Sequence, residues 1–259
     1  MSNRGDRRTV GSAGAPGSTD TGLARRAFGI SFITALVAFQ FIPPQAAQAQ
    51  VGHAPTSSPY RDILHRSSVT FTWGRFRGDG GKLGIGAHDG NTYGIRFDRQ
   101  LSGLVQFGAG VTYADLQRLV TNPNDSVADR VRGPFKQSVV LADIGLQFNL
   151  TGAKTWHGLA PFFEVRGGFA FGSSTPEDAT GYKFGTKLVA TPGIGTRIFV
   201  SQRINLRLQA GLNFWKLKYP ATYTNEPSKE PGAPPLITDG KVDQWTNSAW
   251  YTAGLGIMF

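Results

Sequence analysis

Seven charged residues in this 259-residue chain stand at alternate positions within otherwise apolar segments. They are Arg96, Asp98, Asp143, Glu164, Arg166, Arg197 and Arg207. Charges in a narrow interior are costly unless they are paired and hydrogen-bonded. If the alternating apolar residues face outward, we expect an arginine–carboxylate network inside, with Asp143, Glu164 and Arg166 near its middle. Structural filling of the interior is the favoured interpretation, and a gate that swaps partners to pass ions is the alternative.

Histidine is the residue that would most readily support acid–base catalysis, and the chain has four, at positions 53, 65, 88 and 157. Only His88, with Asp89 beside it, falls in a predicted extracellular loop. A catalytic triad would need further side chains from separate loops. We therefore predict no catalytic residues.

Glycine-rich stretches raise the question of a cofactor or a metal. The Gly-x-Gly triplets at 108–110, 193–195 and 254–256 lack the third glycine of a dinucleotide fingerprint and open no helix. Their glycines more simply make room for large side chains such as Trp250. The Gly- and Asp-rich stretch 78–91 matches no calcium-binding spacing and is predicted to be a flexible surface loop. We expect no cofactor and no metal.

Eight segments alternate apolar and small or polar residues with a period of two, which indicates β-strands. They are 69–76, 92–98, 104–114, 139–150, 161–171, 187–199, 204–215 and 250–259. Most are near the 9 to 11 residues that a tilted membrane strand needs. The sixth segment is the weakest prediction, because Pro192 removes a backbone donor from the ladder.

The connections between these segments alternate strictly between long and short. The short ones are 99–103, 151–160 and 200–203, and the long ones are 77–91, 115–138, 172–186 and 216–248. This pattern predicts short periplasmic turns, longer extracellular loops and an even strand number.

A soluble eight-stranded barrel would alternate in the same way but would turn its apolar face inward. The Gly-heavy polar face favours a tight interior, and aromatic residues near the segment ends favour membrane girdles. Those aromatic residues are Trp73, Phe76, Tyr93, Tyr113, Phe171, Phe199, Phe214, Trp215 and Tyr251.

The first 49 residues are typical of a secretory signal peptide with a long polar n-region. Arg25 and Arg26 precede the mostly apolar stretch 27–42, and Ala47–Gln48–Ala49 supplies a small-x-small cleavage site. We predict a periplasmic lead-in over 50–66 and a barrel over 67–259. The absence of cysteine fits an exported chain. The net charge of +10 is not clustered into a stripe, which argues against nucleic acid. The charge suits attraction to anionic lipopolysaccharide and equally an origin in solvated loops.

The eight alternating segments, the loop pattern and the aromatic last residue, Phe259, resemble the small eight-stranded bacterial outer-membrane barrels of the OmpA-domain, OmpX and OmpW kind. The resemblance covers 69–259. It implies an all-β, eight-stranded antiparallel up-and-down transmembrane β-barrel in the cell outer membrane. It also implies that Phe259 belongs to a C-terminal signal read by the barrel assembly machinery.

We therefore expect a structural or surface-interaction role without catalysis and with a side-chain-filled lumen. The expected partners are outer-membrane lipid and lipopolysaccharide, with an extracellular ligand at the long loops left open. A small-solute or hydrophobic-ligand channel is the alternative function. The resemblance also implies a lipid A-modifying enzyme as a less favoured alternative, because some small outer-membrane barrels are similar to such enzymes.

Overall fold

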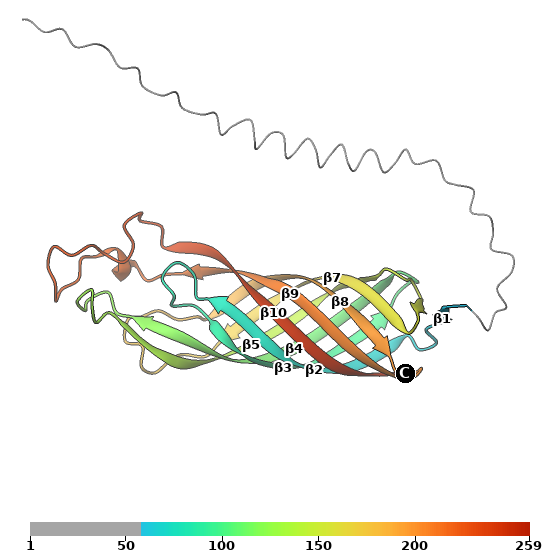
Figure 1. Ribbon diagram of the computed structural model, residues 1–259. Coiled ribbons are helices and arrows are strands. Elements are labelled where there is room, and N and C mark those ends of the chain that lie inside the picture. The colour runs from blue at the N-terminus through green and yellow to red at the C-terminus, as the bar shows by residue number, and fades with distance from the viewer. Residues whose placement is uncertain (1–57) are drawn as a thin grey trace, which may run out of the picture. The chain divides into compact units, whose positions relative to one another are not determined.

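The computed structural model describes residues 58–259, and these form the compact unit shown in colour in Figure 1. The predicted signal peptide, 1–49, and residues 50–57 of the predicted lead-in lie outside the described residues. Among residues 58–259, no helix is long and apolar enough to cross a membrane.

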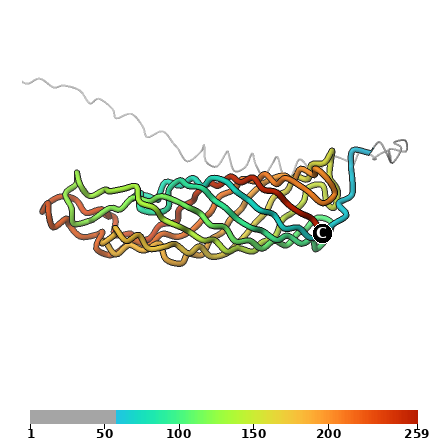
Figure 2. The backbone as a smooth tube through the Cα atoms, turned by 90° about the horizontal axis from the view of Figure 1, so that it is seen from below, coloured from blue at the N-terminus to red at the C-terminus, as the bar shows by residue number. Residues whose placement is uncertain are grey.

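Eight long antiparallel strands close into one barrel (Figures 1 and 2). They are β2 (Ser67–Asp79), β3 (His88–Gln100), β4 (Val105–Thr121), β5 (Val131–Asn149), β7 (Leu159–Gly172), β8 (Thr186–Phe199), β9 (Ile204–Lys218) and β10 (Asp243–Met258). Each pairs with the long strands before and after it in the chain, and β10 pairs with β2. The predicted eight-stranded antiparallel up-and-down barrel is confirmed.

The seam between β2 and β10 leaves no unpaired edge at the end of the chain. The ladder runs from Ala249 opposite Arg77 to Met258 opposite Ser68. Beyond it, the Phe259 amide donates to the Ser67 carbonyl at 2.9 Å, and the Ser67 amide donates to the Phe259 carbonyl at 3.1 Å. Closure of this kind satisfies backbone groups that lipid could not.

Two short strands lie beside the barrel at its short-turn end. β1 (Tyr60–Asp62) pairs with β6 (Lys154–Trp156), and Trp156 of β6 pairs with Leu159 of β7. The end of the lead-in is therefore joined to the turn between β5 and β7.

The exposure of the side chains settles which face of each strand points outward. Val165 is 54% exposed and Leu208 is 45% exposed, whereas Glu164 and Arg207 beside them are each 1% exposed. Apolar side chains cover the outside of the barrel, and ionic ones lie inside. A soluble barrel with the reverse orientation is excluded.

Several strands are longer than the sequence predicts. β4 continues to Thr121 and β5 begins at Val131, so much of the predicted loop 115–138 is paired strand. Likewise, β10 begins at Asp243 rather than near 250 and pairs with the end of β9. Outside a membrane, backbone pairing can continue without an apolar face, so the alternation that marks a membrane strand is absent there.

Pro192 lies within β8 and not at its end. On one side it pairs in register with Val165 of β7. On the other side, the ladder between β8 and β9 passes from Ala190 opposite Phe214 to Gly193 opposite Gly211, skipping two positions. The missing N–H of proline accounts for this local gap without ending the strand.

Candidate functional site

Glu164 is the centre of the charged interior. Its Oε2 lies 3.0 Å from Arg207 Nη2 and 3.3 Å from Arg96 Nη2, and its Oε1 lies 3.2 Å from Arg166 Nε. These residues come from β7, β9 and β3, so the contacts cross the lumen. One carboxylate thus holds three guanidinium groups.

The other two carboxylates extend this cluster in opposite directions. Asp98 accepts a hydrogen bond from Arg96 Nε at 2.7 Å and lies 3.5 Å from Arg207 Nη1. Asp143 accepts from Arg166 Nη1 at 3.1 and 3.2 Å. The structure therefore brings together six of the seven charged residues singled out in the sequence, and Asp143, Glu164 and Arg166 are directly connected.

Arg197 is the residue that the structure leaves apart from the carboxylates. It is 1% exposed, and within residues 58–259 no carboxylate lies within 4.0 Å of its nitrogens. Its Nη2 donates to Asn149 Oδ1 at 3.2 Å, and its guanidinium lies 5.4 Å from the ring centroid of Phe199. Asn149 also accepts from Gln147 Nε2 at 2.7 Å, so the hydrogen-bond partner of this cation is a neutral amide that is itself held by a second amide.

Glycines make the space that these large side chains occupy. A Cβ on Gly108 would lie 2.1 Å from Arg96 Nη2. A Cβ on Gly211 would lie 2.7 Å from Trp250 Cζ2, and one on Gly193 would lie 3.3 Å from the same atom. Inward glycines therefore allow arginine and tryptophan to fill the lumen, as the sequence predicts for the Gly-x-Gly triplets.

A buried apolar cluster fills the interior toward the long loops, and sequence reasoning missed it. Its members include Phe76, Ile85, Leu116, Tyr182, Phe184, Trp215, Leu217, Tyr223 and Ile237. The rings of Phe76 and Trp215 stack with centroids 5.7 Å apart, and Phe184 meets Trp215 edge to face at 5.6 Å.

The assignment of Phe76 and Trp215 to a membrane girdle is therefore wrong, because each is only 1% exposed. Their phase in the period-two repeat carried the correct signal. Phe76 is in register with inward Thr70 and Thr72, and Trp215 is in register with inward Asn213. Of the other girdle residues, Trp73, Tyr93, Tyr113, Phe171 and Tyr251 are exposed, and Phe199 and Phe214 are intermediate.

The first long loop is built into this cluster, contrary to the prediction of a flexible surface loop. Ile85 and Ala87 are buried in it. The His88 ring nitrogen Nε2 is 2.6 Å from the Gly84 carbonyl oxygen. His88 thus fastens the loop to the start of β3.

Ion pairs join loops that are far apart in the sequence. Asp125, between β4 and β5, accepts from Lys229 Nζ at 2.6 Å and from Arg132 Nη2 at 2.9 Å. Its neighbour Val127 donates its amide to Glu230 Oε2 at 2.8 Å. The hydrogen bond from Lys229 holds the pKa of Asp125 below its ordinary value. These contacts clamp the β4–β5 loop to the β9–β10 loop.

The loop between β7 and β8 is held by a second buried group. Arg118 forms an ion pair with Asp178, and its guanidinium lies 4.7 Å from the ring centroid of Tyr182. Thr180 Oγ1 and Tyr223 Oη are 3.0 Å apart, which connects this loop to the 3₁₀ helix η3 (Ala221–Thr224). Burial raises the pKa of Tyr223.

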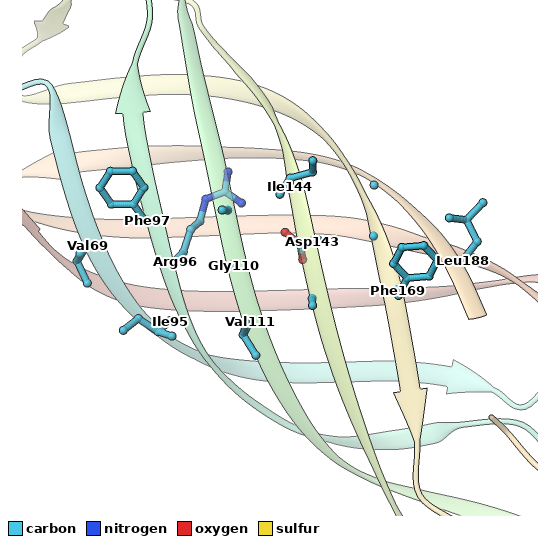
Figure 3. A pocket seen from close by; sticks show the side chains of 14 residues that line it. Val69, Ile95, Arg96, Phe97, Gly110, Val111, Asp143, Ile144, Phe169 and Leu188 are labelled. Atoms are coloured by element: carbon cyan, nitrogen blue, oxygen red, sulfur yellow. The ribbon is translucent and has the colours of Figure 1, made fainter. Parts of the chain in front are cut away.

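The outer wall carries a hollow of about 900 Å³ over β3, β4, β5 and β7 (Figure 3). Large apolar side chains such as Phe97, Ile144 and Phe169 surround it. Small residues, including Gly110 and Gly168, also line it, and so do Arg96 and Asp143 of the interior network. The hollow therefore lies over the part of the wall to which Arg96 and Asp143 of the interior network belong.

Comparison with known proteins finds likeness in fold. No family model matches the chain, and no curated protein matches it. The solved structure of OprG from Pseudomonas aeruginosa is 9% identical and has a TM-score of 0.48, with 77% of this chain and 99% of that chain covered. Neisserial surface protein A (NspA) is 12% identical, with a TM-score of 0.44 and coverages of 78% and 98%. At these TM-scores, the likeness carries no argument about activity.

The class of this protein follows from its own geometry. A closed barrel with an apolar outer wall, a charged interior and an apolar cluster under its loops is a transmembrane β-barrel. Within residues 58–259, no group of three or more His, Cys, Asp or Glu side chains is placed to hold a metal ion.

Proposed function

We propose that this protein is an outer-membrane barrel with a structural or surface-interaction role and a lumen closed by its own side chains. The main support for the proposal is that two separate groups of side chains fill the interior. The charged cluster around Glu164 occupies one level, and the apolar cluster around Trp215 occupies the level toward the loops. A solute would have to break buried ion pairs and also displace packed aromatic rings.

The loops support the surface-interaction part of the proposal. Contacts between Asp125 and Lys229, and between Lys82 Nζ and Asp239 Oδ1 at 3.2 Å, hold the extracellular segments in a fixed arrangement. Loops positioned by a rigid scaffold are a common place for binding residues. A preformed surface also loses little conformational entropy when it binds. We place the extracellular ligand there.

Lipopolysaccharide is the proposed lipid partner. Arg75 is exposed on the outer wall, its Nη1 donates to Asn91 Oδ1 at 3.0 Å, and Trp73, Tyr93 and Tyr251 line the same shallow groove. Aromatic rings prefer the membrane interface, and a guanidinium beside them suits a phosphate of a lipid headgroup.

Planar-bilayer recording tests the closed lumen. Full-length protein refolded in detergent and incorporated into bilayers should give no stepwise conductance, while a porin added to the same bilayer confirms sensitivity. Steady single-channel openings would overturn the proposal. Cell fractionation tests the location, because the protein should sediment with outer membranes. Gel mobility tests the folded barrel, because an unboiled sample should migrate faster than a boiled one.

A hydrophobic-ligand function is the second candidate, favoured by the hollow in the outer wall. Ala142 lies in that hollow, whereas Val140 faces outward on the same strand beyond it. If the hollow binds an acyl chain, saturable binding of a fluorescent fatty acid should be lost in Ala142→Phe and kept in Val140→Phe. Equal partitioning into all three proteins would remove this candidate.

A further inference from the structure

A small, partly open cavity lies inside the barrel between the charged network and the apolar cluster. It measures about 40 Å³, several times the roughly 10–15 Å³ that one water requires. Its wall joins Arg96, Asp143 and Arg166 of the network to Phe76 and Leu141 of the apolar cluster. The cavity is therefore large enough for a small guest and has polar groups on one side.

Four buried donor groups around this cavity have no hydrogen-bond partner among the described residues. They are Thr92 Oγ1, Arg96 Nη1, Trp250 Nε1 and Thr252 Oγ1. The guanidinium and indole nitrogens can only donate, and the hydroxyls can donate. Buried donors without acceptors are costly, so a cavity that gathers four of them calls for an acceptor.

The carboxylate that lines the cavity is already paired with an arginine. Asp143 also lines the cavity, but both its oxygens accept from Arg166 Nη1. The Arg166 guanidinium in turn lies 4.8 Å from the ring centroid of Trp250, which fixes the indole against the cavity. The free donors therefore face a space that the side chains do not fill.

The overall charge of the interior has the sign that an anion would balance. The seven network residues comprise four arginines and three carboxylates, which leaves one positive charge in excess. Lys187, another inward cation, is 8% exposed and forms no ion pair within the described residues. Buried positive charge without a counter-charge is unfavourable.

We propose that this cavity binds a small monovalent inorganic anion of the size of chloride. The anion accepts hydrogen bonds from Arg96, Trp250 and the two threonine hydroxyls, and it offsets the excess positive charge. This site goes beyond the proposed function and does not rest on it, because it depends only on the interior of the closed barrel.

A salt-substitution experiment tests the site on the full chain refolded in detergent. Sodium chloride replaces sodium gluconate at constant ionic strength while the thermal unfolding midpoint is followed. We expect a saturable rise with chloride or bromide, because a ligand that binds only the folded state stabilises it. Equal midpoints in chloride and gluconate at every mixing ratio would overturn the proposal.

Matched threonine variants locate the effect. Thr252→Val and Thr92→Val remove one donor each while keeping the shape, and each should weaken the apparent anion affinity by about tenfold or more. Thr70→Val alters a buried inward threonine outside the cavity and should leave the affinity unchanged. Identical affinities in all three variants would contradict the site.

Anomalous diffraction locates the anion in the unaltered protein and so does not depend on the folding of a variant. Crystals of the unaltered protein grown in sodium bromide should show a bromine peak between Arg96 and Trp250. Density there that is explained by water alone, with no anomalous signal, would show that the cavity holds solvent and would reject the anion.

Discussion

Glu164 holds the interior together because three arginines share its two carboxylate oxygens. Each of those arginines is almost fully removed from solvent. A buried pair contributes little net stability compared with an apolar pair of equal size, but removing one partner leaves the other charge without compensation. The loss of stability on substituting Glu164 therefore comes mainly from the arginines that are left buried without a counter-charge.

The first prediction concerns this residue. Glu164→Gln should lower the free energy of unfolding by about 3–5 kcal/mol, because three guanidinium groups lose their common counter-charge. Urea unfolding in detergent, followed by tryptophan fluorescence, measures it. Glu226→Gln, on an exposed loop residue, is the matched control and should change stability little; equal losses in both variants would contradict a special role for Glu164.

Gly211 leaves the space that Trp250 occupies, and a substitution there tests this packing. A methyl group there would lie 2.5 Å from the Pro192 carbonyl oxygen and 2.7 Å from Trp250 Cζ2. Gly211→Ala should therefore cost about 1–3 kcal/mol through overpacking and shift the tryptophan emission. Gly103→Ala, where a Cβ meets nothing within 4 Å, should leave both unchanged. A wild-type spectrum and stability in Gly211→Ala would show that Trp250 has room to move.

The sequence predicts the direction of single side chains but not their contacts. The period-two alternation was enough to predict that Arg96 and Glu164 point into the barrel. It could not state that these two meet, because β3 and β7 are not neighbours and their contact depends on the tilt and stagger of the closed barrel. The isolation of Arg197 from the carboxylates has the same origin.

Among the elements, the strands were predictable where lipid imposes an alternating pattern and not beyond it. The extension of β4 to Thr121 and of β5 back to Val131 is held by backbone pairing and by contacts with other loops. Side chains there vary in polarity, so their sequence looks like a loop. The apolar cluster under the loops was missed for a related reason, since Ile85 and Ile237 come from segments without any period.

The clamp between loops gives the third prediction. Asp125→Asn should free the β9–β10 loop, which would raise hydrogen exchange over 222–240 without unfolding the barrel. Asp129→Asn is the control in the same loop, because among residues 58–259 the side chain of Asp129 accepts a hydrogen bond only from Ser126 Oγ, at 2.8 Å. Unchanged exchange in Asp125→Asn would mean that the apolar contacts alone hold the loops.

The same clamp should respond to acid in a defined direction. The pKa of Asp125 is lowered in the folded protein, so its contribution is fully present above the ordinary aspartate pKa of about 3.9. The contribution is lost as the pH falls through the lowered value. Loop exchange should therefore rise below about pH 4, and Asp125→Asn should show the raised exchange at neutral pH as well.

In the whole molecule, the outer wall, the interior and the loops each have a different chemical character. The outer wall presents hydrocarbon to lipid, the interior hides its charges, and the loops form a cross-linked cap beyond the wall. All three features follow from the orientation of the strands, with the apolar face outward. Measuring that orientation in a membrane therefore tests the complete arrangement.

The absence of cysteine makes such a test direct. Leu208→Cys and Val165→Cys, labelled with a fluorescent bimane and placed in lipid vesicles, should be quenched by nitroxides attached along the acyl chains. Ser228→Cys, exposed on the β9–β10 loop, should take the same label and escape that quenching. Thr70→Cys faces the filled interior and should remain unlabelled in the folded protein. Labelling of Thr70→Cys together with unquenched Leu208→Cys and Val165→Cys would mean that the barrel wall is reversed.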